Sequence, residues 1–187
     1  GERGHAMPVV SNRGQNGNPF NMPSGVALNK NGDIFVSDGY GNRRVHRFSP
    51  SGELKLSWGA PGTNFGEFAL LHNIGIDQQG RVFICDRENS RIQIFDQTGG
   101  YIETWDDVLS PGDVYMSPEK YIYVVEQGAP TGVSIFEESG KLVTRWRGVE
   151  NGTEAPHGIA VDSKGNVYVA EIGQPRHGQR VLKYAKI

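Results

Sequence analysis

Four copies of one strand pattern follow each other along this chain, and this repetition limits the fold more than any other feature. Each copy has an apolar strand, a polar turn, a second apolar strand ending in an acid, and a third strand. The acids that close the second strands are Asp38, Asp86, Glu126 and Glu171, at steps of 48, 40 and 45 residues. A period of roughly 40–50 residues with strands in each unit predicts the blades of a β-propeller.

The repeats predict one all-β domain over residues 1–187, with antiparallel blades at about 24–59, 72–106, 112–148 and 157–187. Val, Ile and Phe run almost continuously through the second strands, as expected for strands that neighbouring blades cover on both faces. Glycine-bearing turns such as Asn31-Gly32 and Ser51-Gly52 separate the strands, as in β-hairpins. We interpret residues 1–23 as the tail of a preceding blade and a loop.

The fourth copy reaches Ile187 after its third strand, and two arrangements account for this. Propellers have from about four to eight blades, so four copies can close a ring by themselves. Alternatively, the complete ring has six blades and the missing ones lie upstream of Gly1, because an unclosed stack leaves two apolar faces bare.

Composition narrows the function classes. A net charge of −2 argues against a nucleic-acid binder, because such proteins need a basic surface. No apolar run approaches the length of a membrane span. The single cysteine, Cys85, follows Val82, Phe83 and Ile84. We therefore expect a buried free thiol and no internal disulfide.

One set of loops carries the chemically specific residues. In an up-and-down blade, the loops between strands two and three share one end of the propeller with the blade-to-blade connections. These segments are longer than the turns of the other end, and they contain Tyr40, Arg87, His72 and His157. Loops on a rigid sheet scaffold commonly carry function, so we predict the functional site at this end.

His72 and His157 occupy the same register position, immediately before strand one, where the other two copies have Ser24 and Gly112. If a six-bladed ring continued this alternation, three imidazoles would meet at the mouth of the channel. Three histidines with an open fourth position form a catalytic zinc geometry. The alternative is that two polar residues cap strand starts. The other histidines, expected at the surface, are His5, His46 and His177.

Tyr40 and Arg87 belong to the same end of the propeller as the two histidines. A tyrosine beside a metal can act as a base, and an arginine can bind a substrate carboxylate. The structural alternatives are that Tyr40 packs on the next blade and that Arg87 and Arg91 pair with Asp86 or Glu88.

Three segments resemble the NHL-repeat propellers and, more narrowly, the peptidyl-α-hydroxyglycine α-amidating lyases (peptidylamidoglycolate lyases); they are SDGYGNRRVHRFSPSGELKLSWG, CDRENSRIQIFDQTGG and APHGIAVDSKGNVYVAE. The resemblance covers roughly residues 20–186. It implies a secreted or periplasmic six-bladed propeller with zinc held by three histidines at the channel mouth. The reaction it implies splits a C-terminal α-hydroxyglycine into a peptide amide and glyoxylate.

Carried over by motif, the resemblance makes His72 and His157 two of the zinc ligands and places the third in a blade upstream of Gly1. It makes Tyr40, in the DGY loop, the catalytic tyrosine. It makes Arg87, in DREN, an active-site arginine.

Two positions depart from the animal enzymes of this family. Gly41 stands where they have a disulfide cysteine. Gly158 stands where they have an aspartate that helps to hold a structural calcium. The resemblance therefore implies zinc, whereas the departure at Gly158 makes a structural calcium doubtful.

Three function classes follow from these features. The first is a zinc-dependent lyase of the amidating type. The second is a non-catalytic propeller that binds a peptide, glycan or protein partner on its loop-rich face. The third, a lactonase-type hydrolase, fits less well because these loops offer His, Tyr and Arg instead of an acid cluster. We expect a peptide or other small ligand at the channel mouth, and no nucleic acid.

Overall fold

The computed structural model describes residues 19–148, 154–174 and 178–186, and it confirms the all-β propeller fold. These residues form strands and one 3₁₀ turn, η1 (Arg87–Asn89), with no α-helix among them. The strands are β1 (Gly25–Leu28), β2 (Ile34–Asp38), β3 (Arg44–Phe48), β4 (Leu54–Trp58), β5 (Ala60–Pro61), β6 (Glu67–Phe68), β7 (Leu71–Ile76), β8 (Val82–Asp86), β9 (Arg91–Phe95), β10 (Tyr101–Trp105), β11 (Pro111–Met116), β12 (Tyr121–Glu126), β13 (Gly132–Glu137), β14 (Leu142–Arg147), β15 (Pro156–Val161), β16 (Val167–Gln174) and β17 (Gly178–Tyr184).

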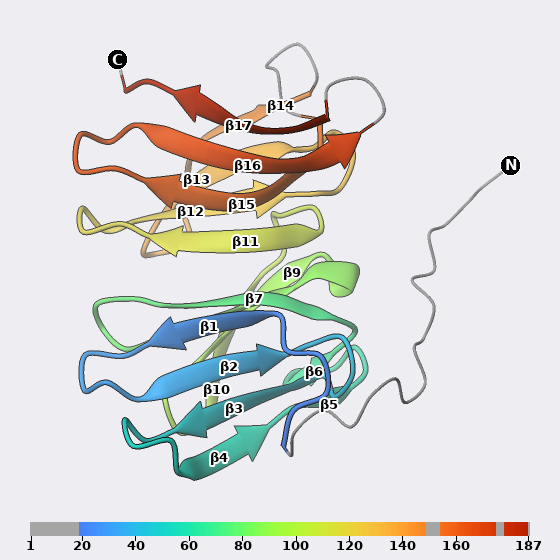
Figure 1. Cartoon of the computed structure of the whole chain (residues 1–187), viewed down its shortest axis with the longest axis vertical. Helices are drawn as coiled ribbons and strands as arrows, with labels where there is room; N and C mark the ends of the chain where they lie inside the picture. Colours follow the sequence, from blue (N-terminus) through green and yellow to red (C-terminus); the bar gives the residue numbers. More distant parts are fainter. Residues whose placement is uncertain (1–18, 149–153, 175–177, 187) are drawn as a thin grey trace, which may run out of the picture.

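The strands form four antiparallel sheets in sequence order, which are the four predicted blades (Figure 1). Blades 1 to 3 have four strands each, β1–β4, β7–β10 and β11–β14. Blade 4 has three, β15–β17, among the described residues. A short parallel pair, β5 with β6, lies in the connection between blades 1 and 2.

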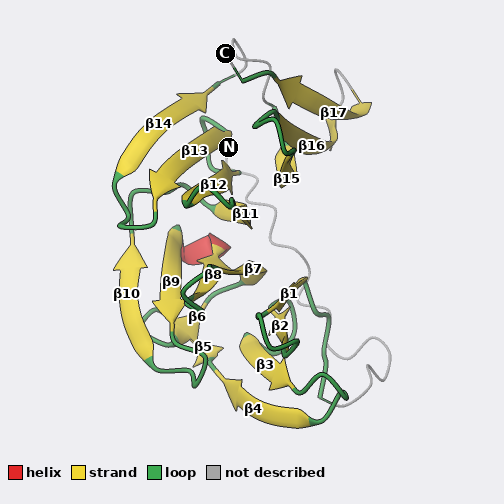
Figure 2. Ribbon diagram, turned by 90° about the vertical axis from the view of Figure 1, so that its left-hand side faces the viewer, coloured by secondary structure: helices red, strands yellow, loops and turns green. Residues whose placement is uncertain are grey.

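The four blades form an open arc, with blades 1 and 4 at its two ends (Figure 2). The first strands contact each other in series, β1 with β7, β7 with β11, and β11 with β15. The described residues thus form four blades, not six, and these do not close into a ring in Figure 2. A six-bladed ring stays a prediction.

Each pair of neighbouring blades encloses its own apolar cluster, and β8 shows how one strand serves two of them. Val82 and Ile84 pack towards blade 1, whereas Phe83 and Cys85 pack towards blade 3. Side chains alternate between the two faces of a strand, so a strand that is covered on both faces must be apolar throughout. Cys85 is completely buried and unbonded, as predicted.

Because successive strands of each blade run in opposite directions, their connections lie alternately at two opposite ends of the arc. The turns between strands one and two lie at the left of Figure 1, and the loops between strands two and three lie at the right with the blade connections. No helix in the described part of the chain is long and apolar enough to cross a membrane.

His46 corrects one expectation from the sequence, because it is 2% exposed instead of lying on the surface. It lies in β3, where its Nδ1 is 2.7 Å from Ser57 Oγ on β4. Its Nε2 lies 3.4 Å from a carboxylate oxygen of Asp38. Phe20 packs edge-on against the imidazole. His5 and His177 lie outside the described residues, as does most of the predicted segment 1–23.

Candidate functional site

The structure brings His72 and His157 together, with ring centroids 4.6 Å apart and planes inclined by 73°. Both residues lie near the starts of first strands, β7 and β15. Blade 3 separates these two strands in the sequence, but its own residue at this register is Gly112, which has no side chain. The alternation seen in the sequence therefore lets two histidines from non-adjacent blades meet.

Only one ring nitrogen of His72, Nδ1, has a hydrogen-bond partner in the described part of the chain. Its Nδ1 donates to the carbonyl oxygen of Gly112 at 2.6 Å. Since a carbonyl only accepts, the proton of a neutral ring lies on Nδ1 and the lone pair on Nε2. Nε2 is buried and has no hydrogen-bond partner among the described residues.

Both imidazoles are neutral near pH 7. Burial, followed by the positive charge of Arg87, lowers the pKa of His72 to about 4. The same two causes lower the pKa of His157. Neutral imidazoles with free lone pairs are the form of histidine that binds a metal ion.

Gly39 brings Tyr40 to this site. A Cβ atom at Gly39 would lie 1.7 Å from the carbonyl oxygen of Leu71, so only glycine lets the loop after β2 lie against the start of β7. This close approach places the Tyr40 ring 6.1 Å from the His72 ring, centroid to centroid.

Arg87 lies at the start of η1, immediately after the acid that ends β8. Its guanidinium carbon lies 5.9 Å from the centroid of the Tyr40 ring. The side chain donates to Glu88 at 2.9 Å and to Gln127 at 3.2 Å. The structural alternative for Arg87, an ion pair with Glu88, is therefore observed. Its binding of a substrate carboxylate stays a prediction.

Gln127 belongs to this site and was missed in the sequence. Its Oε1 accepts from Arg87, and its Nε2 donates to the carbonyl oxygen of Pro156 at 3.2 Å. It therefore joins blades 2, 3 and 4 beside His157. A signal was available, because Gln127 follows the strand-two acid of its blade as Arg87 does in blade 2.

The two histidines fit part of a zinc site. The buried Nε2 of His72, which has no hydrogen bond to a described residue, is the metal-binding atom that such a site needs. The hydrogen bond from Nδ1 to a backbone carbonyl is the usual way of orienting a ligating imidazole. No group of three or more His, Cys, Asp or Glu side chains suited to a metal occurs in the described ranges. A complete site therefore requires a further ligand.

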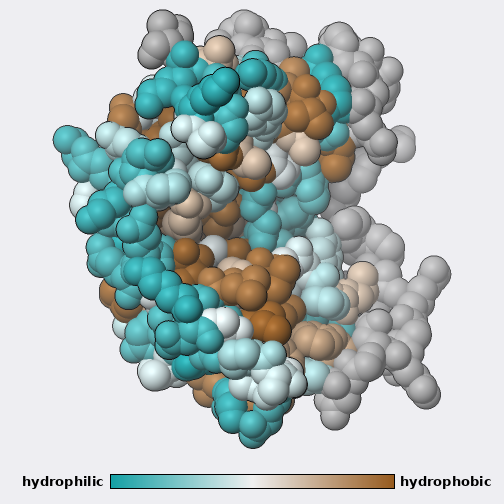
Figure 3. All heavy atoms as spheres, turned by 60° about the vertical axis from the view of Figure 1, so that its left-hand side comes forward, coloured by the Kyte–Doolittle hydropathy of each residue, from teal (hydrophilic) through white to brown (hydrophobic). Residues whose placement is uncertain are grey.

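The opposite face of the arc has a different character. The turns between strands one and two come forward in Figure 3, where apolar side chains gather in the middle of the face between hydrophilic margins. None of the residues predicted for the site lies there.

Comparison with known proteins shows which proteins this chain resembles. The NHL repeat model matches residues 20–48, 68–95 and 154–184. NHL repeat-containing protein 3 of Homo sapiens is 31% identical, over 98% of this chain and 57% of its own length. A probable peptidyl-α-hydroxyglycine α-amidating lyase of Caenorhabditis elegans is 30% identical, over 84% of this chain and 48% of its own length. The chain thus spans about half the length of these relatives.

Two solved structures share the fold at low sequence identity. Hydrazine synthase of Kuenenia stuttgartiensis aligns with a TM-score of 0.73 at 12% identity, over 89% of this chain and 47% of that chain. A virginiamycin B lyase of Staphylococcus aureus aligns with a TM-score of 0.66 at 17% identity, over 87% and 55% respectively. These similarities support the propeller fold alone.

Proposed function

We propose that this chain, which belongs to the NHL-repeat β-propeller family, is part of a zinc-dependent lyase that cleaves peptidyl-α-hydroxyglycine to a peptide amide and glyoxylate. The observation that carries the proposal is the meeting of His72 and His157, with the Nε2 of His72 buried and without a hydrogen bond to any described residue. About 30% identity to an amidating lyase over 84% of the chain adds support.

In this proposal His72, His157 and a third histidine outside the chain hold the metal. Bound zinc supplies a Lewis acid that favours loss of the proton from the substrate hydroxyl. Tyr40, as a phenolate, takes that proton. The oxygen becomes the aldehyde of glyoxylate, the C–N bond breaks, and its electron pair goes to the amide nitrogen, which gains a proton.

Arg87 suits the substrate carboxylate. Its guanidinium faces the Tyr40 ring, and an arginine recognises a carboxylate through paired hydrogen bonds. Gln127 orients Arg87 from the other side. These residues, together with the neighbouring imidazoles, would bind the polar end of a peptide at the channel mouth.

The test measures zinc content and glyoxylate release in the full-length protein, with a peptide ending in α-hydroxyglycine as substrate. Tyr40→Phe should lower the rate by roughly 10²–10⁴ if Tyr40 is the general base, with zinc retained. His157→Ala should lose the metal. Tyr101→Phe, at an exposed tyrosine on β10, is the matched control and should change neither. The 187-residue chain alone should be weakly active at best.

A second candidate is a binding module without catalysis. Arg87 and Gln127 already satisfy part of each other's hydrogen bonding, which favours a fixed recognition surface for a peptide, glycan or protein. A full-length protein that carries zinc but leaves the α-hydroxyglycine peptide intact would overturn the lyase proposal in favour of this module.

A further inference from the structure

Blade 3 contributes no histidine before its first strand, yet this strand contacts both strands that carry one. β11 lies between β7, which carries His72, and β15, which carries His157 (Figure 1). The carbonyl oxygen of Gly112 on β11 accepts the hydrogen bond from Nδ1 of His72 at 2.6 Å. The next residue, Asp113, forms side-chain hydrogen bonds with both neighbouring strands.

The first strands of blades 2, 3 and 4 each contain a β-bulge at the histidine position. The pairing with the second strand shifts by one residue within the segments 71–74, 111–113 and 156–158. A bulge leaves an extra residue outside the ladder and changes the direction of a side chain. His72 and His157 lie in these segments, so the directions of their rings depend on how the bulges are held.

A side chain binds the backbone N–H that follows each bulge. In blade 2, the N–H of Ile74 donates to Oδ1 of Asn73 at 2.7 Å. In blade 3, the N–H of Val114 donates to Oδ1 of Asp113 at 2.8 Å. Blade 4 has Gly158 at this position and therefore no side chain of its own to accept the bond.

Asp113 supplies the acceptor that blade 4 does not have. The N–H of Ile159 donates to Oδ2 of Asp113 at 2.8 Å, while Oδ1 also accepts from the side-chain amide of Asn73. One carboxylate thus joins the bulge of β7 to the bulge of β15. Gly25 leaves room for this arrangement, because a Cβ atom there would collide with Oδ1 of Asn73.

We propose that Asp113 is a positioning residue whose carboxylate, by bridging β7 and β15, sets the spacing of His72 and His157. The consequence for metal binding rests on the proposed zinc site. Zinc binds imidazole nitrogens at about 2.0–2.1 Å, so a small displacement of either ring weakens the site. Replacing a residue that orients metal ligands from outside typically lowers metal affinity about 10- to 100-fold.

Asp113→Asn in the full-length protein tests the bridge. The amide has the shape of the carboxylate but only one accepting oxygen, whereas the bridge uses both, so one strand is released. In the metal-free protein with labelled histidine, the nuclear Overhauser contact between the His72 and His157 rings should lose most of its intensity. The dissociation constant of zinc should rise about 10- to 100-fold. An unchanged contact between the rings would overturn the proposal.

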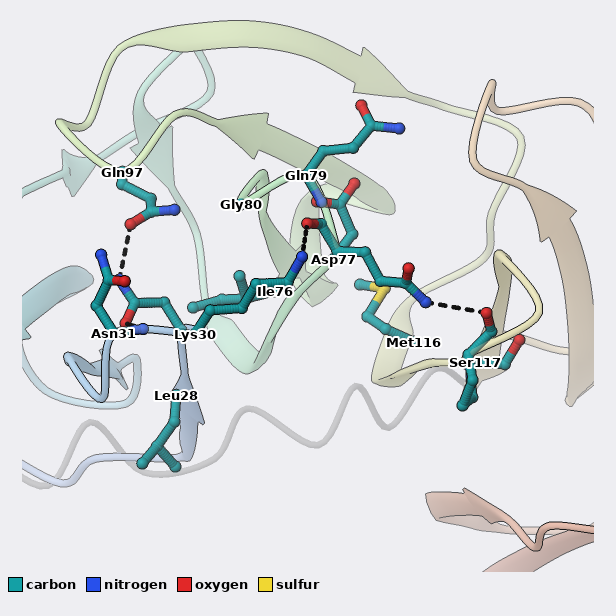
Figure 4. Close-up of a pocket in the computed structure, with 13 residues that line it drawn as sticks. Leu28, Lys30, Asn31, Ile76, Asp77, Gln79, Gly80, Gln97, Met116 and Ser117 are labelled. Carbon is teal, nitrogen blue, oxygen red and sulfur yellow. Dashed lines mark hydrogen bonds between the residues drawn. The ribbon is translucent and has the colours of Figure 1, made fainter.

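Asp77→Asn is the matched control, beyond the other end of β7. Asp77 lines a hollow of about 440 Å³ among the turns between strands one and two (Figure 4). Its carboxylate is also buried and also accepts from two backbone N–H groups, those of Gln79 and Arg81. Both variants should be less stable to urea, but only Asp113→Asn should change the ring contact and the zinc affinity. Equal changes in the two variants would show a purely structural role and overturn the proposal.

Asn73→Ala keeps the proposal testable if Asp113→Asn does not fold. It removes the donor at the β7 end of the bridge and should weaken both the ring contact and zinc binding. Unchanged values in this variant would overturn the proposal. Because the two substitutions break the same bridge, their effects on zinc affinity should not add. A double variant whose loss equals the product of the two single losses would also contradict the bridge.

This inference and the proposed function fail separately. A wild-type protein that binds zinc but leaves the α-hydroxyglycine peptide intact overturns the lyase alone. A wild-type protein that binds no zinc overturns the zinc site, and the ring contact in the metal-free protein then decides whether Asp113 positions the two histidines.

Discussion

Blades 1 and 2 share a strand pattern but hold their buried acids in different ways. Asp86 ends β8 and is completely buried. Arg91, its partner residue across the ladder, donates from Nε at 2.8 Å. In blade 1 Asp38 is equally buried, but the residue at the same ladder position, Arg44, is exposed and forms no ion pair with a described residue.

Smaller groups replace the arginine at Asp38. Asn42 donates to one carboxylate oxygen at 2.6 Å, and the backbone N–H of Asn21 donates to the same oxygen at 2.8 Å. The other oxygen, Oδ1, has no hydrogen bond among the described residues. The Nε2 atom of His46 lies 3.4 Å from Oδ2, the oxygen that is already hydrogen-bonded.

The difference shows that residues at equivalent ladder positions of two blades do not always make equivalent side-chain contacts. The loop after Asp38 is one residue longer than the loop after Asp86 before the ladder resumes. It is also shaped by Gly39, which has to lie against Leu71, and this shape brings Tyr40 to His72. Both loops supply a residue of the candidate site, Tyr40 in blade 1 and Arg87 in blade 2, but only blade 2 of these two holds its acid with the arginine across the ladder.

The largest expected effect is on Arg91, the arginine that blade 2, unlike blade 1, uses to hold its buried acid. Arg91→Met leaves the carboxylate of Asp86 buried without its ion pair. It also removes hydrogen bonds to the carbonyls of Thr63, Asn64 and Glu67. We expect a loss of about 3–5 kcal/mol in the free energy of unfolding, measured by urea denaturation.

Arg44→Met is the matched control, at the same ladder position of blade 1. Its effect should stay within about 0.5 kcal/mol, as for other exposed substitutions. Similar losses in the two variants would show that the two blades hold their acids alike.

The pH dependence of the free energy of unfolding tests a second difference between the blades. At the position before strand one, blade 1 has Ser24 and blade 2 has His72. The folded pKa of His72 is about 4, below the ordinary value near 6.5, so the unfolded chain binds this proton first. Stability is therefore complete above about pH 6.5 and decreases towards pH 4, by up to about 3 kcal/mol. Urea denaturation at several pH values with EDTA present measures it.

His72→Gln keeps a donor for the Gly112 carbonyl and should flatten this part of the profile. The difference between the two proteins isolates the imidazole from other groups that titrate in this range. Asp113 is one of these, because burial raises its pKa to about 6. Parallel profiles for the two proteins would refute the assignment to His72.

Gly39→Ala tests the close approach that blade 1 needs. The new Cβ would meet the carbonyl oxygen of Leu71, so the loop has to move, at a cost of about 1–3 kcal/mol, and the Tyr40 ring should leave His72. Chemical shifts of the His72 ring and urea denaturation report both changes.

Gly158→Ala is the control for this substitution. Its Cβ would find its nearest neighbour, an oxygen of Asp113, at 3.6 Å, which is an ordinary contact. We expect a change near zero or a slight gain from the lower entropy of the unfolded chain. A larger loss here than at Gly39 would contradict the packing argument.

The smallest effect is expected at His46, whose ladder position in blade 2 is taken by Gln93. His46→Gln places the residue of blade 2 into blade 1 and retains a group that bonds Ser57. The free energy of unfolding should change by about 1 kcal/mol or less, by urea denaturation. A loss comparable to that of Arg91→Met would mean that His46 serves as the main ion-pair partner of Asp38.

The fold was predictable because it depends on repeated local patterns. The blades and the buried Cys85 all follow from strand periodicity and spacing, which the sequence carries directly. The burial of His46 was not predicted because a single polar residue in a β-strand does not indicate whether its side chain will be covered. Here Phe20 and the neighbouring strand β4 cover it. Gln127 was missed because its two side-chain hydrogen bonds are made to residues of blades 2 and 4, and the strand pattern of its own blade does not predict them.

The sequence by itself determined the strand-and-turn repeat, the end of the arc at which Tyr40, His72, Arg87 and His157 would lie, and the alternation of histidine with Ser24 and Gly112. These are consequences of alternation along a chain. Only the tertiary structure decided that the two imidazoles lie 4.6 Å apart and that Gln127 joins blades 2 and 4 through Arg87 and Pro156. Both depend on distances between separate blades, which packing sets and local pattern does not encode.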